Sequence, residues 1–355
     1  MRFDALTGIR AIAATLVFIY HNRKYWRAQL HPEMLRLVNE FHFGVSLFFV
    51  LSGFLIAFTY STKPTESPKN YVKYIALRFA RIFPLYWLIL IALSLDPKFA
   101  QLKHPALTAS LLHGFSNRLN LNGLAQAWSL NVEMTFYLMA PLLCLLQRRS
   151  LITLIVFLGS LLLLTLGIGK IWELYNGNPL QFLHPVKFVL GSTFPGRFTE
   201  FLAGMLMASA IKNNHSWIHL PHKSVIGCLG IVVFTYLIGL FQPDIFHHGS
   251  DHPIGWILQT FILPVFVVIT LAGLINEETR MQKMLKSNLF ILLGNASFAF
   301  YLIHISYVNI RLRWFVLGPD RNFVLLWLFS IILYLFIEKP LYNYCKKAIT
   351  KNKPH

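Results

Sequence analysis

Long apolar runs without Asp, Glu, Lys or Arg constrain the fold of this chain more than any other feature. A helix needs about 20 residues to cross the hydrocarbon core of a bilayer, which is about 30 Å thick. Five runs reach that length: Phe41–Thr62, Ser150–Gly169, Ser224–Pro243, His252–Asn276 and Ser287–Ile310. Each of them is predicted to form a membrane-spanning helix.

Apolar runs that are shorter, or that carry a charge, fill the gaps between these five. They are Leu6–Tyr20, Ile82–Leu95, Ala127–Leu146, Pro195–Ile211 and Asn322–Ile337. The ten runs together predict an all-α, polytopic membrane helix bundle with about ten transmembrane helices. The short segment Pro105–Phe115 is interpreted as a re-entrant or interfacial piece.

The composition agrees with a lipid environment. Among the 355 residues 55% are hydrophobic and 13% are charged, whereas soluble domains have about a quarter of their residues charged. The formal net charge is +18, and the basic residues lie mostly between apolar runs. We interpret them as anchors at the membrane surface and expect no nucleic-acid partner. The three cysteines are scattered without metal-ligand spacing, so no metal site is predicted.

The distribution of basic residues predicts the orientation in the membrane. Ten spans put both termini on the same side, and the loops on that side carry more Lys and Arg. The positive-inside rule then places both termini in the cytoplasm, although the loop 22–40 on the opposite side is also basic. We therefore predict a multi-pass protein of the cytoplasmic (inner) membrane. Residues 1–345 form its membrane domain and 346–355 a short basic cytoplasmic tail.

Ionisable side chains inside the predicted spans are candidates for function, because each costs a few kcal/mol near the bilayer centre. The set comprises two carboxylates, two cations and two histidines, with a third histidine at a span boundary: Glu133, Glu200, Arg10, Arg197, His21, His304 and His42. Arg197 and Glu200 are three residues apart and favour a structural ion pair. For His304 a hydrogen-bonded packing role is favoured.

Arg10 and His21 share one face of the first predicted helix. Eleven residues separate them, which places them within about 20° of each other and about 16 Å apart along the axis. The small side chains between them on this face, at Ala13, Ala14 and Val17, could line a narrow passage. Alternatively, Arg10 extends to the cytoplasmic surface and His21 simply ends the helix.

Glu133 is expected at the same depth as His21. Arg148 and Arg149 end its helix on the cytoplasmic side, so Glu133 belongs to the outer half, as does His21. A carboxylate beside an imidazole stabilises the imidazolium that forms when histidine acts as a general base. A buried pair with a purely structural role is the alternative.

Arg78 and Arg81 form a second candidate site. They lie three residues apart, immediately before the predicted span Ile82–Leu95, on the cytoplasmic side. Paired guanidinium groups match the geometry of phosphate. Ordinary membrane-surface anchoring is the alternative.

The order of these motifs along the chain resembles the acyltransferase-3 family of integral membrane acyltransferases. Arg10 and His21 come first, and the other motifs follow in this order: GVSLFFVLSGFLI, RFARIFPLYWL, AWSLNVEMTFYLMAPLL, GRFTEFLAGMLMA, ASFAFYLIHISY and IEKPLYN. Together they cover nearly the whole chain. The resemblance implies O-acylation, usually O-acetylation, of a cell-envelope glycan such as lipopolysaccharide O-antigen or exopolysaccharide. Acetyl-coenzyme A (acetyl-CoA) would be the cytoplasmic co-substrate, with no cofactor.

The resemblance also implies roles for individual residues. His21 matches the essential histidine, Arg10 its partner, and Glu133 the glutamate of the family motif. The donor-binding residues are then Arg78, Arg81, Arg10 and Ser52. His21 acts either as a general base or as a transient acyl carrier, and the sequence does not separate the two.

Other functions fit the same residues. Arg10, His21 and Glu133 could form the path of a transporter or flippase for a lipid-linked sugar, since intramembrane ionisable groups are typical of that class. The chain could also transfer another acyl group, or acylate a small molecule. The partners expected for the acetyltransferase are acetyl-CoA, a glycan or lipid-linked glycan acceptor, and membrane lipid.

Overall fold

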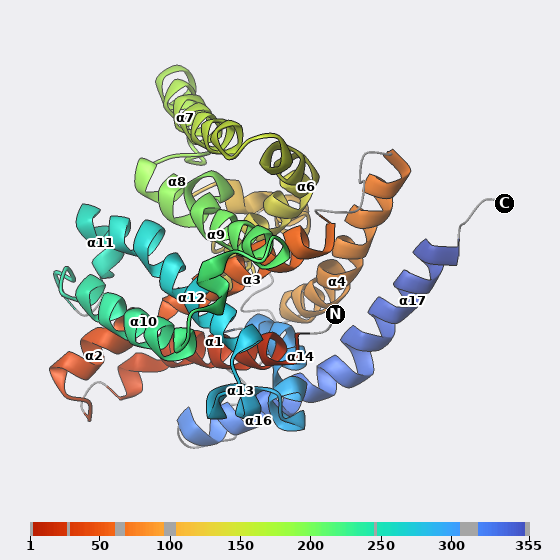
Figure 1. Ribbon diagram of the computed structural model, residues 1–355. Helices are drawn as coiled ribbons and strands as arrows, with labels where there is room; N and C mark the ends of the chain where they lie inside the picture. The colour runs from red at the N-terminus through yellow and green to blue at the C-terminus, as the bar shows by residue number, and fades with distance from the viewer. Residues whose placement is uncertain are drawn as a thin grey trace. The chain divides into compact units, whose positions relative to one another are not determined.

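The computed structural model describes residues 3–26, 29–60, 68–95, 104–244, 247–305 and 319–351 (Figure 1). Over these residues the chain forms helices and loops without any β-strand, and one isolated antiparallel bridge joins Ser116 to Phe182. The all-α prediction is therefore confirmed. Residues 61–62 and 306–310 of the predicted spans, and 352–355 of the predicted tail, lie outside the described residues.

The chain divides into two compact units. Unit 1 comprises Met1–Phe58, Thr199–Phe300 and Val316–Trp327, and unit 2 comprises Thr59–Phe198, Tyr301–Phe315 and Leu328–His355. The helices mainly within unit 1 are α1 (Asp4–Asn22), α2 (Pro32–Asn39), α3 (Gly44–Tyr60), α9 (Phe194–Lys212), α10 (Lys223–Gly239), α11 (Pro253–Ile257), α12 (Leu263–Asn276), α13 (Arg280–Leu285), α14 (Asn288–Ile303) and α16 (Pro319–Leu333). Those of unit 2 are α4 (Pro68–Ser94), α5 (Pro105–Ala109), α6 (Trp128–Arg149), α7 (Leu151–Asn176), α8 (Val186–Ser192) and α17 (Lys339–Lys351).

Six helical segments among the described residues are long and apolar enough to cross a membrane. They are Pro32–Tyr60, Lys69–Ser94, Ala125–Arg149, Leu151–Tyr175, Pro253–Asn276 and Arg321–Thr350. The other four expected positions hold the shorter apolar helices α10 and α14 and the 19-residue helices α1 and α9. A multi-pass membrane protein is thus supported, while the count of about ten spans and the cytoplasmic termini stay predictions.

One predicted span is part of a longer helix. The run Ile82–Leu95 belongs to the continuous helix α4, which begins at Pro68, so where the span itself starts stays a prediction. Arg78 and Arg81 therefore lie inside this helix and not before it. The segment Pro105–Phe115 forms two short helical pieces, α5 and the 3₁₀ turn Leu112–Phe115, which are too short to span a bilayer.

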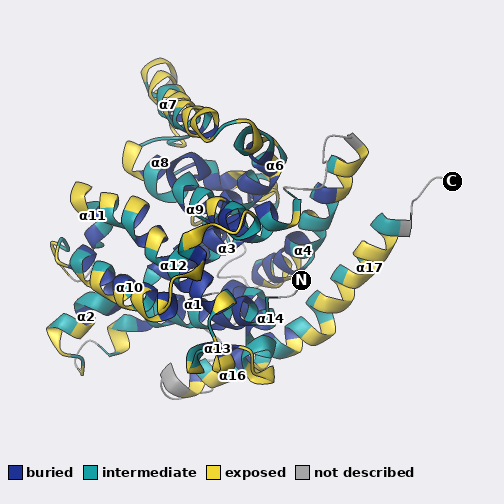
Figure 2. Ribbon diagram, viewed as in Figure 1, coloured by how far each residue is buried: buried dark blue, intermediate teal, exposed yellow. Residues whose placement is uncertain are grey.

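Helix α7 is exposed along most of its length (Figure 2), and most of its exposed residues are apolar. Leu163, Leu164 and Leu174 are 71%, 60% and 70% exposed. A soluble protein rarely exposes so continuous an apolar surface, whereas a lipid-facing helix does so without cost. The pattern agrees with a membrane location for this helix.

Glycines bring helices of unit 1 into close contact. A Cβ atom on Gly53 of α3 would overlap the carbonyl of Phe201 on α9, and one on Gly204 of α9 would overlap the carbonyl of Val50 on α3. The rings of Phe49 and Phe201 stack beside this contact at 4.7 Å. Small residues let membrane helices approach closely and gain van der Waals contact.

Replacing Gly53 by alanine is expected to lower the stability of the protein. The added methyl group would push α3 away from α9, at a cost of about 1–3 kcal/mol. Gly159→Ala on α7 is the control, since a Cβ there meets nothing within 4 Å. Thermal unfolding in detergent should show a lower midpoint for Gly53→Ala only. Equal midpoints for the two variants would contradict the close α3–α9 contact.

Candidate active site

Arg10 and His21 both lie on α1, as predicted. The Arg10 guanidinium is 6.0 Å from the centre of the Phe48 ring on α3. The predicted passage between the two residues is not open along its whole length, because Gly44 of α3 packs against Ala13 and Val17. The small side chains of this stripe serve helix packing there.

Tyr20 connects the end of α1 to His42 and His248, a contact that sequence analysis missed. Its ring lies 4.6 Å from that of His21, 5.5 Å from that of His42 and 5.4 Å from that of His248, measured between centres. The hydroxyl group of Tyr20 is 3.0 Å from Nε2 of His248. Burial, followed by the proximity of His42, lowers the pKa of His248 to about 4. More than 200 residues separate Tyr20 from His248 along the chain, so no local pattern could reveal this contact.

Arg78 lies in unit 2 within a cage of tyrosine rings. Its Cζ atom is 5.9 Å from the ring centre of Tyr60, 5.5 Å from that of Tyr74 and 5.5 Å from that of Tyr137. Nη2 donates a hydrogen bond to the Tyr60 hydroxyl at 3.4 Å. Cation–π contacts of this kind stabilise a guanidinium that has lost part of its hydration.

Glu133 and Arg78 are linked through Tyr137. The Tyr137 hydroxyl donates a 2.5 Å hydrogen bond to Oε1 of Glu133, one turn earlier on α6, while the Tyr137 ring faces Arg78. The expected neighbour of Glu133 was His21, but the two belong to different units, so that pairing stays a prediction. The four-residue spacing of Glu133 and Tyr137 is the sequence signal that could have indicated their contact.

The remaining predicted site residues are distributed between the two units. Arg81 lies on α4 three residues after Arg78, in unit 2, and is half-buried. Ser52 is half-buried on α3 in unit 1, as Arg10 is on α1. The structure thus brings Arg78 and Glu133 into one network and leaves the common donor site of all four donor-binding residues a prediction.

Two other residues that were predicted to lie inside the membrane have structural contacts. His304 is 1% exposed, and its Nδ1 lies 2.7 Å from the carbonyl oxygen of Tyr301, which supports the packing role favoured for it. Nη1 of Arg197 donates to the carbonyl oxygen of Gly191 at 3.1 Å. The Arg197 guanidinium also lies 6.0 Å from the Trp128 ring centre.

Comparison with known proteins identifies the family. The acyltransferase-3 family model, described as an acyltransferase domain, matches residues 3–338. The chain therefore belongs to this family and is an acyltransferase of the membrane-embedded type. The resemblance inferred from the motifs is confirmed.

Curated relatives carry consistent names. Acyltransferase MdmB of Streptomyces mycarofaciens is 24% identical over 358 residues, which cover 92% of this chain and 84% of that protein. O-acetyltransferase OatA of Staphylococcus aureus is 23% identical over 364 residues, which cover 95% of this chain but 56% of that protein. The chain thus spans little more than half the length of the staphylococcal relative. No solved structure matches the chain.

Removing the Tyr137 hydroxyl group is expected to destabilise unit 2. Tyr137→Phe keeps the ring over Arg78 but removes the hydrogen bond to Glu133, at a cost of about 1.5–3 kcal/mol for a bond to a charged acceptor. Tyr175→Phe on α7 is the control, because Tyr175 is 83% exposed. Thermal unfolding of both variants tests the bond. A Tyr137→Phe variant that unfolds at the wild-type midpoint would refute a stabilising hydrogen bond between Tyr137 and Glu133.

Proposed function

We propose that this chain transfers an acetyl group from cytoplasmic acetyl-CoA to a hydroxyl group of a cell-envelope glycan, such as lipopolysaccharide O-antigen or exopolysaccharide. The family match over residues 3–338 carries the proposal, because it defines the acyltransferase class. The name of the relative OatA, an O-acetyltransferase, supports an acetyl group as the acyl group and oxygen as the acceptor atom. The protein works as a multi-pass protein of the cytoplasmic membrane.

The chemistry is the exchange of a thioester for an oxygen ester. The acceptor hydroxyl oxygen attacks the thioester carbonyl carbon, the carbon–sulfur bond breaks, and coenzyme A leaves as a thiol after it takes up the proton. His21 removes the hydroxyl proton as general base, and Glu133 stabilises the imidazolium that results. In the alternative route the His21 imidazole first accepts the acetyl group and then passes it to the hydroxyl.

Arg78 and Arg81 bind phosphate groups of coenzyme A in this proposal, with Arg10 and Ser52 along the path of the donor. The three-residue spacing of the two arginines on α4 supports a shared site. The tyrosine rings around Arg78 support it further, since they orient the guanidinium. A guanidinium with a fixed orientation loses less entropy on binding phosphate.

Label transfer in membrane vesicles tests the proposed function. Vesicles that contain the protein receive acetyl-labelled coenzyme A, and the label is then measured in envelope glycan, in small molecules and in released coenzyme A. Label in the glycan fraction supports the proposal, whereas label in a small molecule assigns a different acceptor. A transporter or flippase consumes no acetyl-CoA, so the absence of both label transfer and thioester cleavage would contradict the proposal.

His21→Ala is expected to reduce label transfer by about 10²- to 10⁴-fold, the contribution of a general base. His219→Ala is the control, because His219 is exposed and bonds only Asn214 in the described structure. A single turnover without acceptor separates the two routes, since only the acyl-carrier route releases one coenzyme A per protein molecule. Transfer by His21→Ala within a few-fold of wild type would exclude both roles.

Arg78→Lys is expected to raise the KM for acetyl-CoA about tenfold or more while kcat changes little. Lysine keeps the charge but loses the planar group that stacks on tyrosine and binds phosphate through two bonds. Arg149→Lys, at the exposed end of α6, is the matched control. Steady-state kinetics with varied acetyl-CoA measures the effect. A fall in kcat at unchanged KM would contradict the donor-binding role of Arg78.

A further inference from the structure

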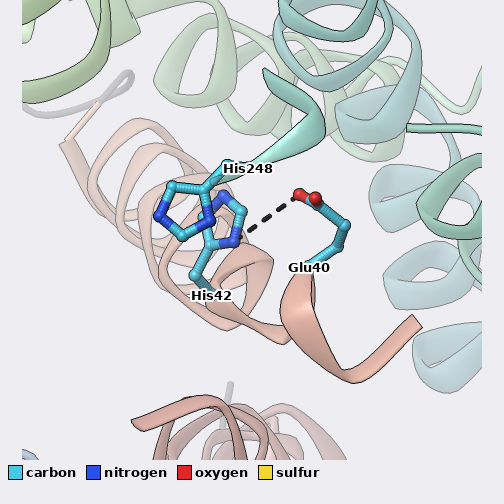
Figure 3. A group of neighbouring side chains, drawn as sticks. All are labelled: Glu40, His42 and His248. Carbon is cyan, nitrogen blue, oxygen red and sulfur yellow. Dashed lines mark ion pairs between the residues drawn. The ribbon is translucent and has the colours of Figure 1, made fainter. Parts of the chain in front are cut away.

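Three polar side chains of unit 1 converge near the end of α1 (Figure 3). Glu40 follows α2, His42 lies in the 3₁₀ turn Phe41–Phe43, and His248 precedes the 3₁₀ turn Gly249–Asp251. Each offers one ligand atom, and these three atoms all lie within 4.8 Å of one another. The cluster thus joins two parts of the chain that are about 200 residues apart in sequence.

The Glu40 carboxylate is buried, and only one of its two oxygens accepts hydrogen bonds from the described residues. The residue is 2% exposed, and Oε1 accepts hydrogen bonds from the side-chain nitrogen of Gln242 and from the backbone N–H of Gly249, both at 2.6 Å. Oε2 is also buried, but it has no hydrogen-bond partner among the described residues. It points toward His42, whose Nδ1 lies 3.7 Å away. A buried oxygen without a partner costs free energy unless a cation or a donor reaches it.

His248 presents a free ring nitrogen to the same place. Its Nε2 lies 3.0 Å from the Tyr20 hydroxyl, while its Nδ1 is buried without a hydrogen bond among the described residues. The His42 and His248 rings lie 4.6 Å apart between centres. A histidine that binds a metal through one nitrogen typically uses the other in a hydrogen bond that orients the ring. His248 has this arrangement.

We propose that Glu40, His42 and His248 bind a divalent transition-metal ion, for which Zn²⁺ is the best match. Two imidazoles and one carboxylate form a common three-residue zinc set, which leaves a fourth position for water or another oxygen ligand. Ligand atoms of tetrahedral zinc lie roughly 3.4 Å apart, so atoms that now lie up to 4.8 Å apart must approach by as much as about 1.4 Å. His42 can make this movement, because its side chain is 20% exposed.

The neighbouring contacts suit a metal site. Gln242 and Gly249 fix one oxygen of Glu40 and direct the other toward the histidines. The Tyr20 hydroxyl orients His248, and the Tyr20 ring contacts the rings of both His248 and His21. Hydrogen bonds from such neighbours position metal ligands and raise affinity. A bound ion would therefore lie one side chain away from His21.

Metal binding can be measured without acyl donor or acceptor, so the result does not depend on the proposed function. The whole protein is purified in detergent through a tag without histidines, stripped with EDTA and titrated with Zn²⁺ against a chromophoric chelator. We expect one Zn²⁺ per chain with a Kd in the micromolar range or below. Glu40→Gln and His42→Asn should each weaken binding by at least about tenfold, a conservative bound for the loss of a direct ligand.

Matched variants make the test specific. His247→Asn is the matched control next to His248. His247 is exposed and pairs with Asp244 at 2.9 Å, so its loss should leave zinc affinity unchanged. Unfolding midpoints are first measured in EDTA for wild type and for His42→Asn, and added Zn²⁺ should then raise the midpoint of wild type only. Cobalt substitution should give the intense visible absorption of a tetrahedral site. The proposal is overturned if wild type binds no zinc, or if Glu40→Gln and His42→Asn bind it as tightly as His247→Asn.

Discussion

The structure depends most on how it accommodates charge inside helices that are otherwise apolar enough to cross a membrane. A charged side chain near the bilayer centre costs a few kcal/mol if it stays unpaired. Arg78 lies within Lys69–Ser94, a helix long and apolar enough to cross a membrane, and rings from the end of α3, from α4 and from α6 surround its guanidinium. The cation is therefore stabilised by aromatic faces. The same contacts join three helix segments of unit 2, so the buried charge of Arg78 also contributes to helix packing.

In unit 1 the helices are held together in a different way, by close approach at glycine residues. The motifs GVSLFFVLSGFLI and GRFTEFLAGMLMA are about 150 residues apart in sequence, yet Gly53 of the first and Gly204 of the second each pack on the backbone of the other. Lipid tails are as apolar as leucine, so helices in a membrane associate through such contacts and not through the hydrophobic effect. Part of what marks the family in sequence is therefore helix packing and not chemistry.

Apolar runs predicted where the helices lie, but not the full length of α4. Hydropathy places Arg78 and Arg81 before the apolar run Ile82–Leu95, and it cannot register that the rings of Tyr60, Tyr74 and Tyr137 surround Arg78 within the helix. Arg10 and His21 were placed correctly on one helix, because their spacing is local. The cluster of Glu40, His42 and His248 escaped prediction for the opposite reason. His248 is about 200 residues from Glu40 and His42 in sequence, and a search for metal-ligand spacing finds only ligands that are close together along the chain.

The link from Arg78 through Tyr137 to Glu133 changes how the glutamate should be understood. Sequence reasoning assigned Glu133 to the histidine, as an orienting carboxylate for a general base. In the structure its Oε1 accepts the Tyr137 hydroxyl, whose ring faces Arg78, so Glu133 also positions a wall of the arginine cage. The tyrosine rings hold the guanidinium in place through cation–π contact and through the hydrogen bond from Nη2 to the Tyr60 hydroxyl. Under the proposed donor-binding role of Arg78, a carboxylate that fixes one of those rings would act on donor binding through Tyr137, a role for Glu133 that does not depend on contact with His21.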